Sequence, residues 1–340
     1  MTQIKNHKHT FFEKTLIHII LKFKSINEFL FDLENSIFKN KEKQNSKKIF
    51  ITGLARSGTS SALDLFCQSG NYGYQTYEDM PFLMCPNLYL KFRSFFKKKF
   101  NIQPRSHSDG ILISQGSPEA FEEFFWKNEM NNNYISNNFL LENHLTEENI
   151  SNFNKYINLV LKKNNKKIYI SKNNNNILRL KFISEKLNDS IILIFFRNPV
   201  AHCYSLLKQH LNFINLQNNN KFILDYMNYL GHFEFGKNLK RFEIGKYKEN
   251  DPTKINFWIE IWINYYNYIL KYISYNNVYL ICYEDLALRK NEYLRKKINN
   301  EFLSDKINFY SYQNKNNFSD ASEANFDYAY QIYEKLRSKV

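Results

Sequence analysis

Short apolar runs and longer amphipathic segments alternate along this chain. The short runs are rich in β-branched and aromatic residues and predict strands at 49–52, 72–77, 111–114, 167–170, 190–196 and 278–282. The longer segments carry apolar residues at helical spacing and predict helices at 63–66, 117–126, 146–163, 177–187, 199–211, 221–246, 252–275 and from about 290. Repeated strand–helix alternation predicts an α/β fold, with a mostly parallel sheet flanked by helices.

Residues 1–46 predict a helical extension in front of the α/β part of the chain. Its expected apolar face consists of Phe12, Leu16, Ile19, Ile20 and Phe23. The lysine-rich stretch 39–48 is interpreted as a linker. Amphipathic helices usually pack inward, so we expect this extension to dock on the core; a membrane surface is the alternative. The remainder, 47–340, is predicted to form one α/β domain.

The first strand leads into a glycine loop, Gly53-Leu-Ala-Arg-Ser-Gly-Thr-Ser60. Strand, glycine loop and helix form the layout of a phosphate cradle, in which backbone N–H groups and the positive helix end face an anion. Gly53 and Gly58 have the spacing of a nucleotide-binding P-loop, and Ser60 stands at its hydroxyl position. Thr59 replaces the lysine that an NTPase needs, and the cation is Arg56 inside the loop. We therefore predict a phosphate-like ligand; an ordinary turn between strand and helix is the alternative.

A second motif lies where the most hydrophobic strand ends. The run 190–196 is followed by Arg197-Asn-Pro199, and Ser205 comes eight residues after the arginine. The planar guanidinium of arginine meets phosphate oxygens bidentately. If a helix begins at Pro199, Arg197 and Ser205 can face one anion. The alternative interpretation is an arginine and a serine that cap a helix.

These two motifs resemble those of the sulfotransferases that use 3′-phosphoadenosine-5′-phosphosulfate (PAPS). The run Ile51-Thr-Gly-Leu-Ala-Arg-Ser-Gly-Thr-Ser60 is similar to their 5′-phosphosulfate loop. The Arg197 segment is similar to their 3′-phosphate motif, with Asn198 where aspartate is usual. The late strand that ends in Tyr283-Glu-Asp-Leu286 also resembles a segment of this family. In all, the resemblance runs from about residue 48 to 286.

The resemblance implies a three-layer P-loop-type fold and transfer of a sulfuryl group from PAPS to a hydroxyl or amine, without a metal. The cofactor-binding residues that it implies are Ala55, Arg56, Ser57, Gly58, Thr59, Ser60, Arg197 and Ser205. Sulfuryl transfer also needs cations that neutralise charge on the leaving phosphate and on the transferred group. Arg56 and Lys172, each at or near a strand end, are the electrostatic candidates.

The general base, which must take the proton of the acceptor hydroxyl, stays open between three residues. His107 has a suitable intrinsic pKa. Asp79 and Glu78 lie about as far past the glycine loop as the acidic base of the tyrosylprotein branch of the family. An ordinary structural role is the alternative for each of them.

The net charge and the cysteine content restrict the expected binding partners and the expected cellular compartment. The net charge is +14, but lysines are spread through the chain together with asparagines, so the charge suits anionic ligands in general and does not select nucleic acid. Cys67, Cys85, Cys203 and Cys282 lie far apart, which favours a reducing compartment over disulfides or a zinc site. No run approaches the ~20 apolar residues of a membrane span. We predict a cytoplasmic enzyme.

The acceptor is expected to be a carbohydrate or surface glycan, because the aromatic segments 81–100 and 221–275 could stack on sugars, although they could equally form core. Three alternatives stay open. A P-loop kinase or NTPase would bind Mg²⁺ and ATP, and a nucleic-acid-binding protein would bind DNA or RNA in a salt-sensitive way. A sulfotransferase-like protein without catalysis would only bind the nucleotide. The oligomeric state is also open.

Overall fold

The computed structural model describes residues 11–38, 46–93, 103–104, 112–298, 302–303 and 326–340. Its centre is a five-stranded sheet with the order β2-β6-β1-β7-β9, and every neighbouring pair is parallel. The five strands are β1 (Lys47–Gly53), β2 (Tyr72–Gly73), β6 (Ile168–Lys172), β7 (Ser190–Phe196) and β9 (Val278–Cys282). The short strands β3 (Gln103–Pro104), β4 (Leu112–Ile113), β5 (Phe139–Leu140) and β8 (Arg241–Phe242) form two small additional pairs.

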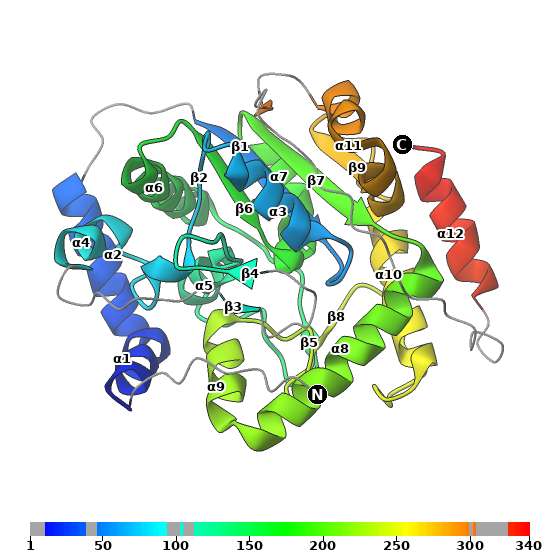
Figure 1. Cartoon of the computed structure of the whole chain (residues 1–340), viewed down its shortest axis with the longest axis horizontal. Helices are drawn as coiled ribbons and strands as arrows, with labels where there is room; N and C mark the ends of the chain where they lie inside the picture. Colours follow the sequence, from blue (N-terminus) through cyan, green and yellow to red (C-terminus); the bar gives the residue numbers. More distant parts are fainter. Residues whose placement is uncertain (1–10, 39–45, 94–102, 105–111, 299–301, 304–325) are drawn as a thin grey trace.

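Helices connect the strands and cover both faces of the sheet (Figure 1). The α-helices are α1 (Phe11–Lys22), α2 (Lys24–Phe38), α3 (Thr59–Gln68), α4 (Pro86–Phe92), α5 (Glu122–Glu129), α6 (Glu147–Asn164), α7 (Leu180–Lys186), α8 (Pro199–Asn219), α9 (Lys221–Leu230), α10 (Ile255–Ile269), α11 (Tyr283–Lys297) and α12 (Asp327–Arg337). Two 3₁₀-helices, η1 (Tyr77–Asp79) and η3 (Asn174–Arg179), follow β2 and β6.

The period of two in the central strands divides the core into two layers. Along β7, Ile191, Leu193 and Phe195 join the apolar residues of α3 and α11. Ile192 and Ile194 point to the other face and join α6 and α10. Every side chain of β7 is therefore buried, as expected of a central parallel strand. The molecule has the three-layer α/β architecture predicted from the sequence, and the fold class is confirmed.

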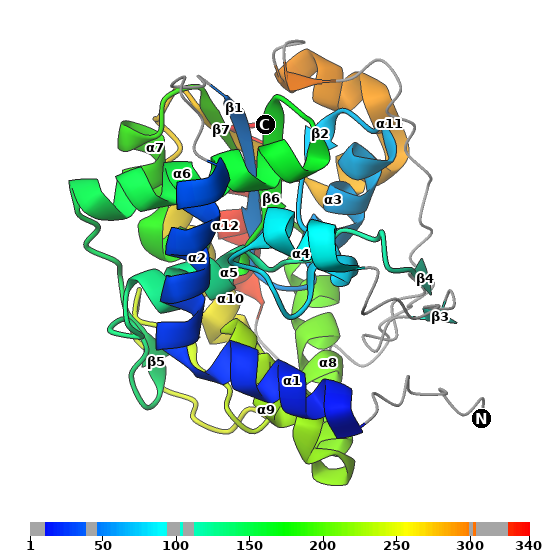
Figure 2. The same ribbon diagram turned by 90° about the vertical axis from the view of Figure 1, so that its left-hand side faces the viewer.

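The N-terminal extension docks on the α/β domain as two helices (Figure 2). Ile17, Leu21 and Phe31 lie in the main core cluster. The buried carboxylate of Glu34 on α2 accepts hydrogen bonds from the backbone N–H groups of Asn87 (2.6 Å) and Leu88 (2.8 Å), so it caps the start of α4. Burial raises the pKa of Glu34.

The expected apolar face of this extension is partly wrong. Ile19 and Phe23 are exposed, whereas Ile17 and Leu21 are buried with Ile20. Within α1 the buried stripe follows Ile17, Ile20 and Leu21, and Phe23 lies between α1 and α2. Residue Phe12 has no described side chain.

Two predicted helices and one predicted strand are shorter in the structure than expected. The prediction at 221–246 ends at Leu230, because Gly231 takes a left-handed conformation (φ +76°) and terminates α9. The chain then forms a loop and β8. The predicted strand 72–77 is reduced to β2, because Thr76 caps the 3₁₀-helix η1. The prediction at 252–275 shrinks to α10.

Candidate active site

The loop after β1 needs glycine at two positions. Gly53 has φ +152°, and a Cβ atom there would lie 2.7 Å from the carbonyl oxygen of Phe195. Gly58 has φ +100° and precedes α3; a Cβ atom there would lie 2.4 Å from the ring of Tyr283. Both values lie in the region that only glycine reaches without strain. The loop is therefore held closely between β7 and the start of α11.

Arg56 and Ser57 carry unusual features inside this loop. Arg56 takes a left-handed conformation (φ +71°), which costs energy for a residue with a side chain and is typical of functional sites. Ser57 is fully buried, and its hydroxyl has no hydrogen-bond partner within the part of the chain that the structure describes. A buried unpaired hydroxyl near the start of a helix suits an oxyanion ligand. Thr59 and Ser60 form the first turn of α3.

The two sequence motifs meet at this loop. β7 runs next to β1, with Gly53 opposite Phe195, so Arg197 follows directly beside the loop. The Arg197 Nη1 atom lies 3.5 Å from the backbone oxygen of Arg56. The Arg56 Nε atom donates to the hydroxyl of Ser205 across 3.3 Å. Residues 149 positions apart in the sequence thus share one site at the carboxyl edge of the sheet.

The buried side chain of His202 holds the backbone of the glycine loop by a hydrogen bond. Its Nε2 atom donates to the carbonyl oxygen of Ala55 (2.7 Å), and its Nδ1 atom accepts from the indole N–H of Trp262 (3.2 Å). Both ring nitrogens are therefore satisfied with the ring neutral. Complete burial lowers the pKa of His202 to about 3. This histidine fixes the loop backbone at Ala55, one residue before Arg56.

The turn at Asn198 is held from two sides. The Asn198 side chain accepts from the backbone N–H of Ala201 (3.2 Å) and so caps α8. The backbone N–H of Asn198 donates to the carboxylate of Glu284 (2.9 Å) at the start of α11. The guanidinium of Arg197 also lies 5.0 Å from the ring centre of Tyr283. Asparagine here performs a capping role.

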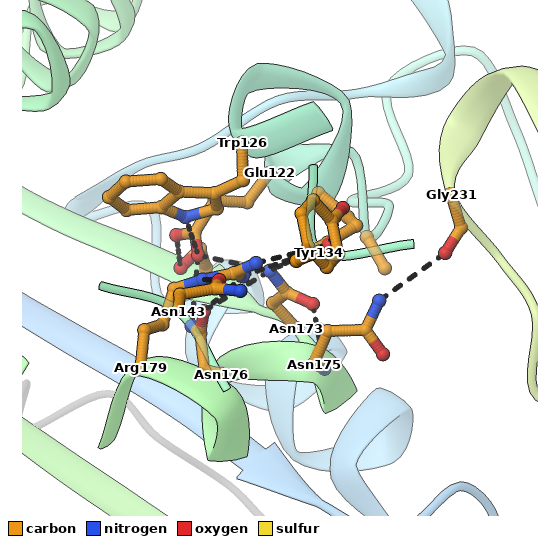
Figure 3. Close-up of polar contacts among 12 residues, drawn as sticks. Glu122, Trp126, Tyr134, Asn143, Asn173, Asn175, Asn176, Arg179 and Gly231 are labelled. Carbon is orange, nitrogen blue, oxygen red and sulfur yellow. Dashed lines mark hydrogen bonds and ion pairs between the residues drawn. The ribbon is translucent and has the colours of Figure 1, made fainter. Parts of the chain in front are cut away.

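A buried polar network surrounds the end of β6 (Figure 3). Glu123 accepts two hydrogen bonds from the guanidinium of Arg179, at 2.7 and 3.2 Å. Glu122 accepts from Asn176 (2.9 Å) and from the indole N–H of Trp126 (3.3 Å). Burial raises the pKa of Glu123, but the adjacent guanidinium outweighs burial and holds this pKa below its usual value. The network fixes the segment that follows Lys172.

Lys172 is the last residue of β6, which pairs with β1, the strand that leads into the glycine loop. It pairs in register with Ile51, two residues before Gly53, and its side chain is 9% exposed. The next backbone N–H, that of Asn173, donates to the carbonyl oxygen of Ile51 (2.9 Å). A cation at this position lies on the same sheet edge as Arg56, as the sequence predicts.

Comparison with known proteins identifies the family. Residues 48–296, well over half of the 340 residues, match the model of the sulfotransferase family. The chain belongs to the sulfotransferase family. No curated protein matches the sequence.

Solved sulfotransferases are similar to this family member. The sulfotransferase STF9 from Mycobacterium avium has a TM-score of 0.51 and 9% sequence identity, covering 86% of this chain and 73% of that chain. The sulfotransferase STF1 from Mycobacterium tuberculosis H37Rv has a TM-score of 0.47 and 11% identity, covering 88% of this chain and 80% of that chain. At 9% identity the likeness to STF9 shows a shared fold.

The three base candidates of this sulfotransferase-family chain have different surroundings. Asp79 is 1% exposed, accepts from the backbone N–H of Thr76 (2.7 Å) and pairs with the ammonium group of Lys163 (2.7 Å). Glu78 forms an ion pair with Arg93 (3.2 Å). His107 lies outside the described residues. Asp79 thus has structural partners that its sequence position does not reveal.

Sequence reasoning missed two supporting residues of this site, His202 and Tyr283, and the partners of a third, Glu284. His202 has no motif of its own, but its place three residues before Ser205 on one helix is a signal that it faces the same loop. The acids of the segment Tyr283-Glu-Asp-Leu286 are expected to orient the loop and the cofactor-binding groups, but the sequence names no contact partner for Tyr283 or Glu284. Their contacts with Gly58, Arg197 and Asn198 depend on the packing of β9 beside β7, which no local pattern encodes.

Proposed function

We propose that this chain transfers a sulfuryl group from PAPS to a hydroxyl or amine of an acceptor, by in-line displacement. The observation that carries the proposal is the contact between the two motifs, with Arg56 on Ser205 at 3.3 Å and Arg197 on the loop carbonyl at 3.5 Å. These contacts support binding of both phosphate-bearing ends of one nucleotide in a single site. When bound, PAPS supplies the activated sulfuryl group.

The residues present suit such a ligand. Ser57 offers a buried hydroxyl with no partner among the described residues, and the first turn of α3 offers backbone N–H groups. In the proposal, Ala55 to Ser60 hold the 5′ end, and Arg197 with Ser205 holds the 3′-phosphate. Fixed donors of this kind are preorganised for oxyanions.

The proposed chemistry uses two cations and one base. Arg56 and Lys172 would neutralise charge that develops on the leaving phosphate and the transferred group. The carboxylate of Asp79 already accepts from Thr76 and Lys163, so its lone pairs are committed to the fold. We therefore propose His107 as the base that takes the acceptor proton, with Glu78 as the second candidate.

The aromatic rings of α10 do not support the carbohydrate acceptor that the sequence led us to expect. Trp258, Trp262, Tyr265 and Tyr266 of α10 are at most 1% exposed, so these rings form core and do not support sugar stacking. The proposal therefore specifies a hydroxyl- or amine-bearing acceptor, and a glycan stays one member of that class.

A cytoplasmic location is supported by the four cysteines, which are free, buried thiols. Among the helices described, none combines the length and hydropathy that a bilayer crossing requires.

A turnover assay tests the proposal. Radiolabelled PAPS is incubated with a panel of hydroxyl and amine acceptors, without metal and with Mg²⁺, and labelled product is separated from PAPS. We expect metal-independent transfer, and a loss of roughly 100-fold or more in kcat for Arg56→Ala. Mg²⁺-dependent ATP hydrolysis without transfer would support the NTPase alternative, and transfer unchanged in Arg56→Ala would contradict the assigned role.

A further inference from the structure

Two asparagine side chains beyond Lys172 face a segment from elsewhere in the chain. The Nδ2 atom of Asn174 donates to the carboxylate of Glu234 (2.8 Å), and the Nδ2 atom of Asn175 donates to the carbonyl oxygen of Gly231 (3.3 Å). A carboxylate and a carbonyl only accept hydrogen bonds, so both amides are fixed with nitrogen toward the segment 231–234. The orientation of both amide oxygens follows from this.

These two amide oxygens have no donor among the residues that the structure describes. Asn174 and Asn175 are 4% and 2% exposed, and the Oδ1 atom of each is without a hydrogen-bond partner in the described part of the chain. A buried acceptor without a donor destabilises the fold. The neighbouring Asn176 differs, because its Oδ1 atom accepts from Asn173 (3.2 Å) and Arg179 (3.1 Å). Only the first two asparagines therefore require an outside donor.

The opposite segment adds further acceptors. The Nε2 atom of His232 must donate to the carbonyl oxygen of Ala120 (3.0 Å), because a carbonyl cannot donate. In the neutral tautomer that this bond selects, the lone pair lies on Nδ1. Glu234, which is partly exposed, adds a carboxylate. Acceptor atoms and a negative charge gather here, so a matching ligand must carry hydrogen-bond donors.

Asn174 and Asn175 lie close to Lys172, one of the two cations of the proposed chemistry. Asn174 and Asn175 follow Lys172 by two and three residues, and the Asn173 N–H is bonded to Ile51 of the loop strand (2.9 Å). Figure 3 shows Asn175 turned toward Gly231, whereas Asn176 and Arg179 point into the buried network around Glu122. Asn175 thus faces away from this network, and both asparagines directly follow the carboxyl end of β6, the sheet edge where α/β proteins bind ligands.

We propose that Asn174 and Asn175, with Glu234 and His232, bind the sulfuryl acceptor, and that this acceptor presents hydroxyl or ammonium groups to them. The proposal rests on the proposed function for the identity of the reaction. It favours polyols and amino sugars over acceptors that carry carboxylates or phosphates, since those would meet acceptor atoms and a carboxylate.

A crystal structure with 3′,5′-ADP and D-glucosamine tests the site directly, whether or not the enzyme turns over. The expected result is a hydroxyl or ammonium group of the sugar within hydrogen-bond distance of both amide oxygens. Water alone on these oxygens, or glucosamine bound elsewhere, would overturn the proposal. Failure of 3′,5′-ADP to bind would instead count against the proposed function, and the position of the sugar would still decide this one.

Kinetics supply the second measurement. Asn174→Leu and Asn175→Leu keep a side chain of the same length and branching, and remove the unpaired oxygens together with the bonded amide nitrogens. Each should raise the KM for D-glucosamine about tenfold or more, while the Kd for 3′,5′-ADP stays within twofold. Asn219→Leu, at the exposed end of α8, is the matched control and should change neither value. An unchanged KM in variants whose thermal unfolding shows a folded protein would overturn the proposal.

Discussion

At the scale of single residues, the site depends on backbone conformations that only particular side chains allow. Arg56 accepts a left-handed conformation in order to place its guanidinium on Ser205. Gly58 allows Tyr283 to approach the loop where a Cβ atom would collide with the ring. The sequence predicts both positions, because glycine spacing and an internal arginine are local signals.

The close approach at Gly58 leads to a first prediction. Gly58→Ala places a methyl group 2.4 Å from the Tyr283 ring at φ +100°, so the loop or the ring must move. We expect a loss of about 1–3 kcal/mol in the free energy of unfolding and weaker binding of 3′,5′-ADP. Urea denaturation and calorimetry measure the two effects. Gly116→Ala is the control, because nothing lies within 4 Å of its Cβ position; equal effects of both substitutions would contradict the argument.

His210 leads to a prediction about acid stability. Burial lowers its pKa to about 4, whereas the unfolded chain has the ordinary value near 6.5. As the pH falls, the unfolded chain takes up the proton first, so stability that is present above pH 6.5 is lost between pH 6.5 and about 4. His202, with its pKa near 3, adds to the same slope.

The measurement compares pH slopes. His210→Gln keeps an acceptor for the backbone N–H of Gly236 but cannot titrate. Between pH 6 and 4.5, its free energy of unfolding should fall less steeply than that of the wild type, by about 1 kcal/mol per pH unit. Urea titrations at several pH values give both slopes, and parallel slopes would show that His210 does not titrate in this way.

At the scale of elements, the predictions succeed where one local pattern decides and fail where distant contacts decide. The unit of β1, loop and α3 and the unit of β7 and α8 follow from apolar runs, glycines and Pro199. The helix predicted at 221–246 fails, since its aromatic content conceals the stop at Gly231. The distance of Asp79 past the glycine loop makes it a base candidate, but Lys163, 84 residues away, gives it a structural partner that no local pattern indicates.

The C-terminal helix shows the same limit. The stretch from Ser304 is rich in polar residues, yet α12 lies within it and places Ala329, Ile332 and Leu336 in the main core. These positions follow helical spacing, so a signal is present but short. Arg337 of α12 pairs with Asp285 (2.7 Å), and Tyr333 donates to Glu284 (3.3 Å). The helix thus supports Glu284, which holds the Asn198 turn, and the neighbouring Asp285.

This support leads to an element-scale prediction. Glu284→Ala removes the acceptor of the Asn198 backbone N–H and loosens the turn that carries Arg197. We expect the Kd for 3′,5′-ADP to rise about tenfold, equivalent to ~1.4 kcal/mol. Glu334→Ala, on the exposed side of α12, should leave the Kd unchanged. Calorimetric titration checks both variants, and equal affinities would mean that Glu284 does not position the site.

At the scale of the whole molecule, the sheet converts sequence separation into proximity. The order β6-β1-β7 places Lys172, Arg56 and Arg197 along one edge, although they come from three distant parts of the chain. Parallel strands whose carboxyl ends meet at one edge make this convergence predictable from motifs alone. The buried asparagines after Lys172 were not predictable as a site, because asparagine is abundant throughout the sequence and no single position stands out.

The central claim is that one doubly phosphorylated adenosine occupies the place where the loop and the Arg197 motif meet. Isothermal titration of the wild-type protein with 3′,5′-ADP, repeated with Arg197→Ala and with Mg²⁺-ATP, tests it most directly. The account predicts saturable, metal-independent binding of 3′,5′-ADP that weakens at least tenfold in Arg197→Ala, and weaker binding of ATP. No binding of 3′,5′-ADP, or equal binding by the variant, would contradict it.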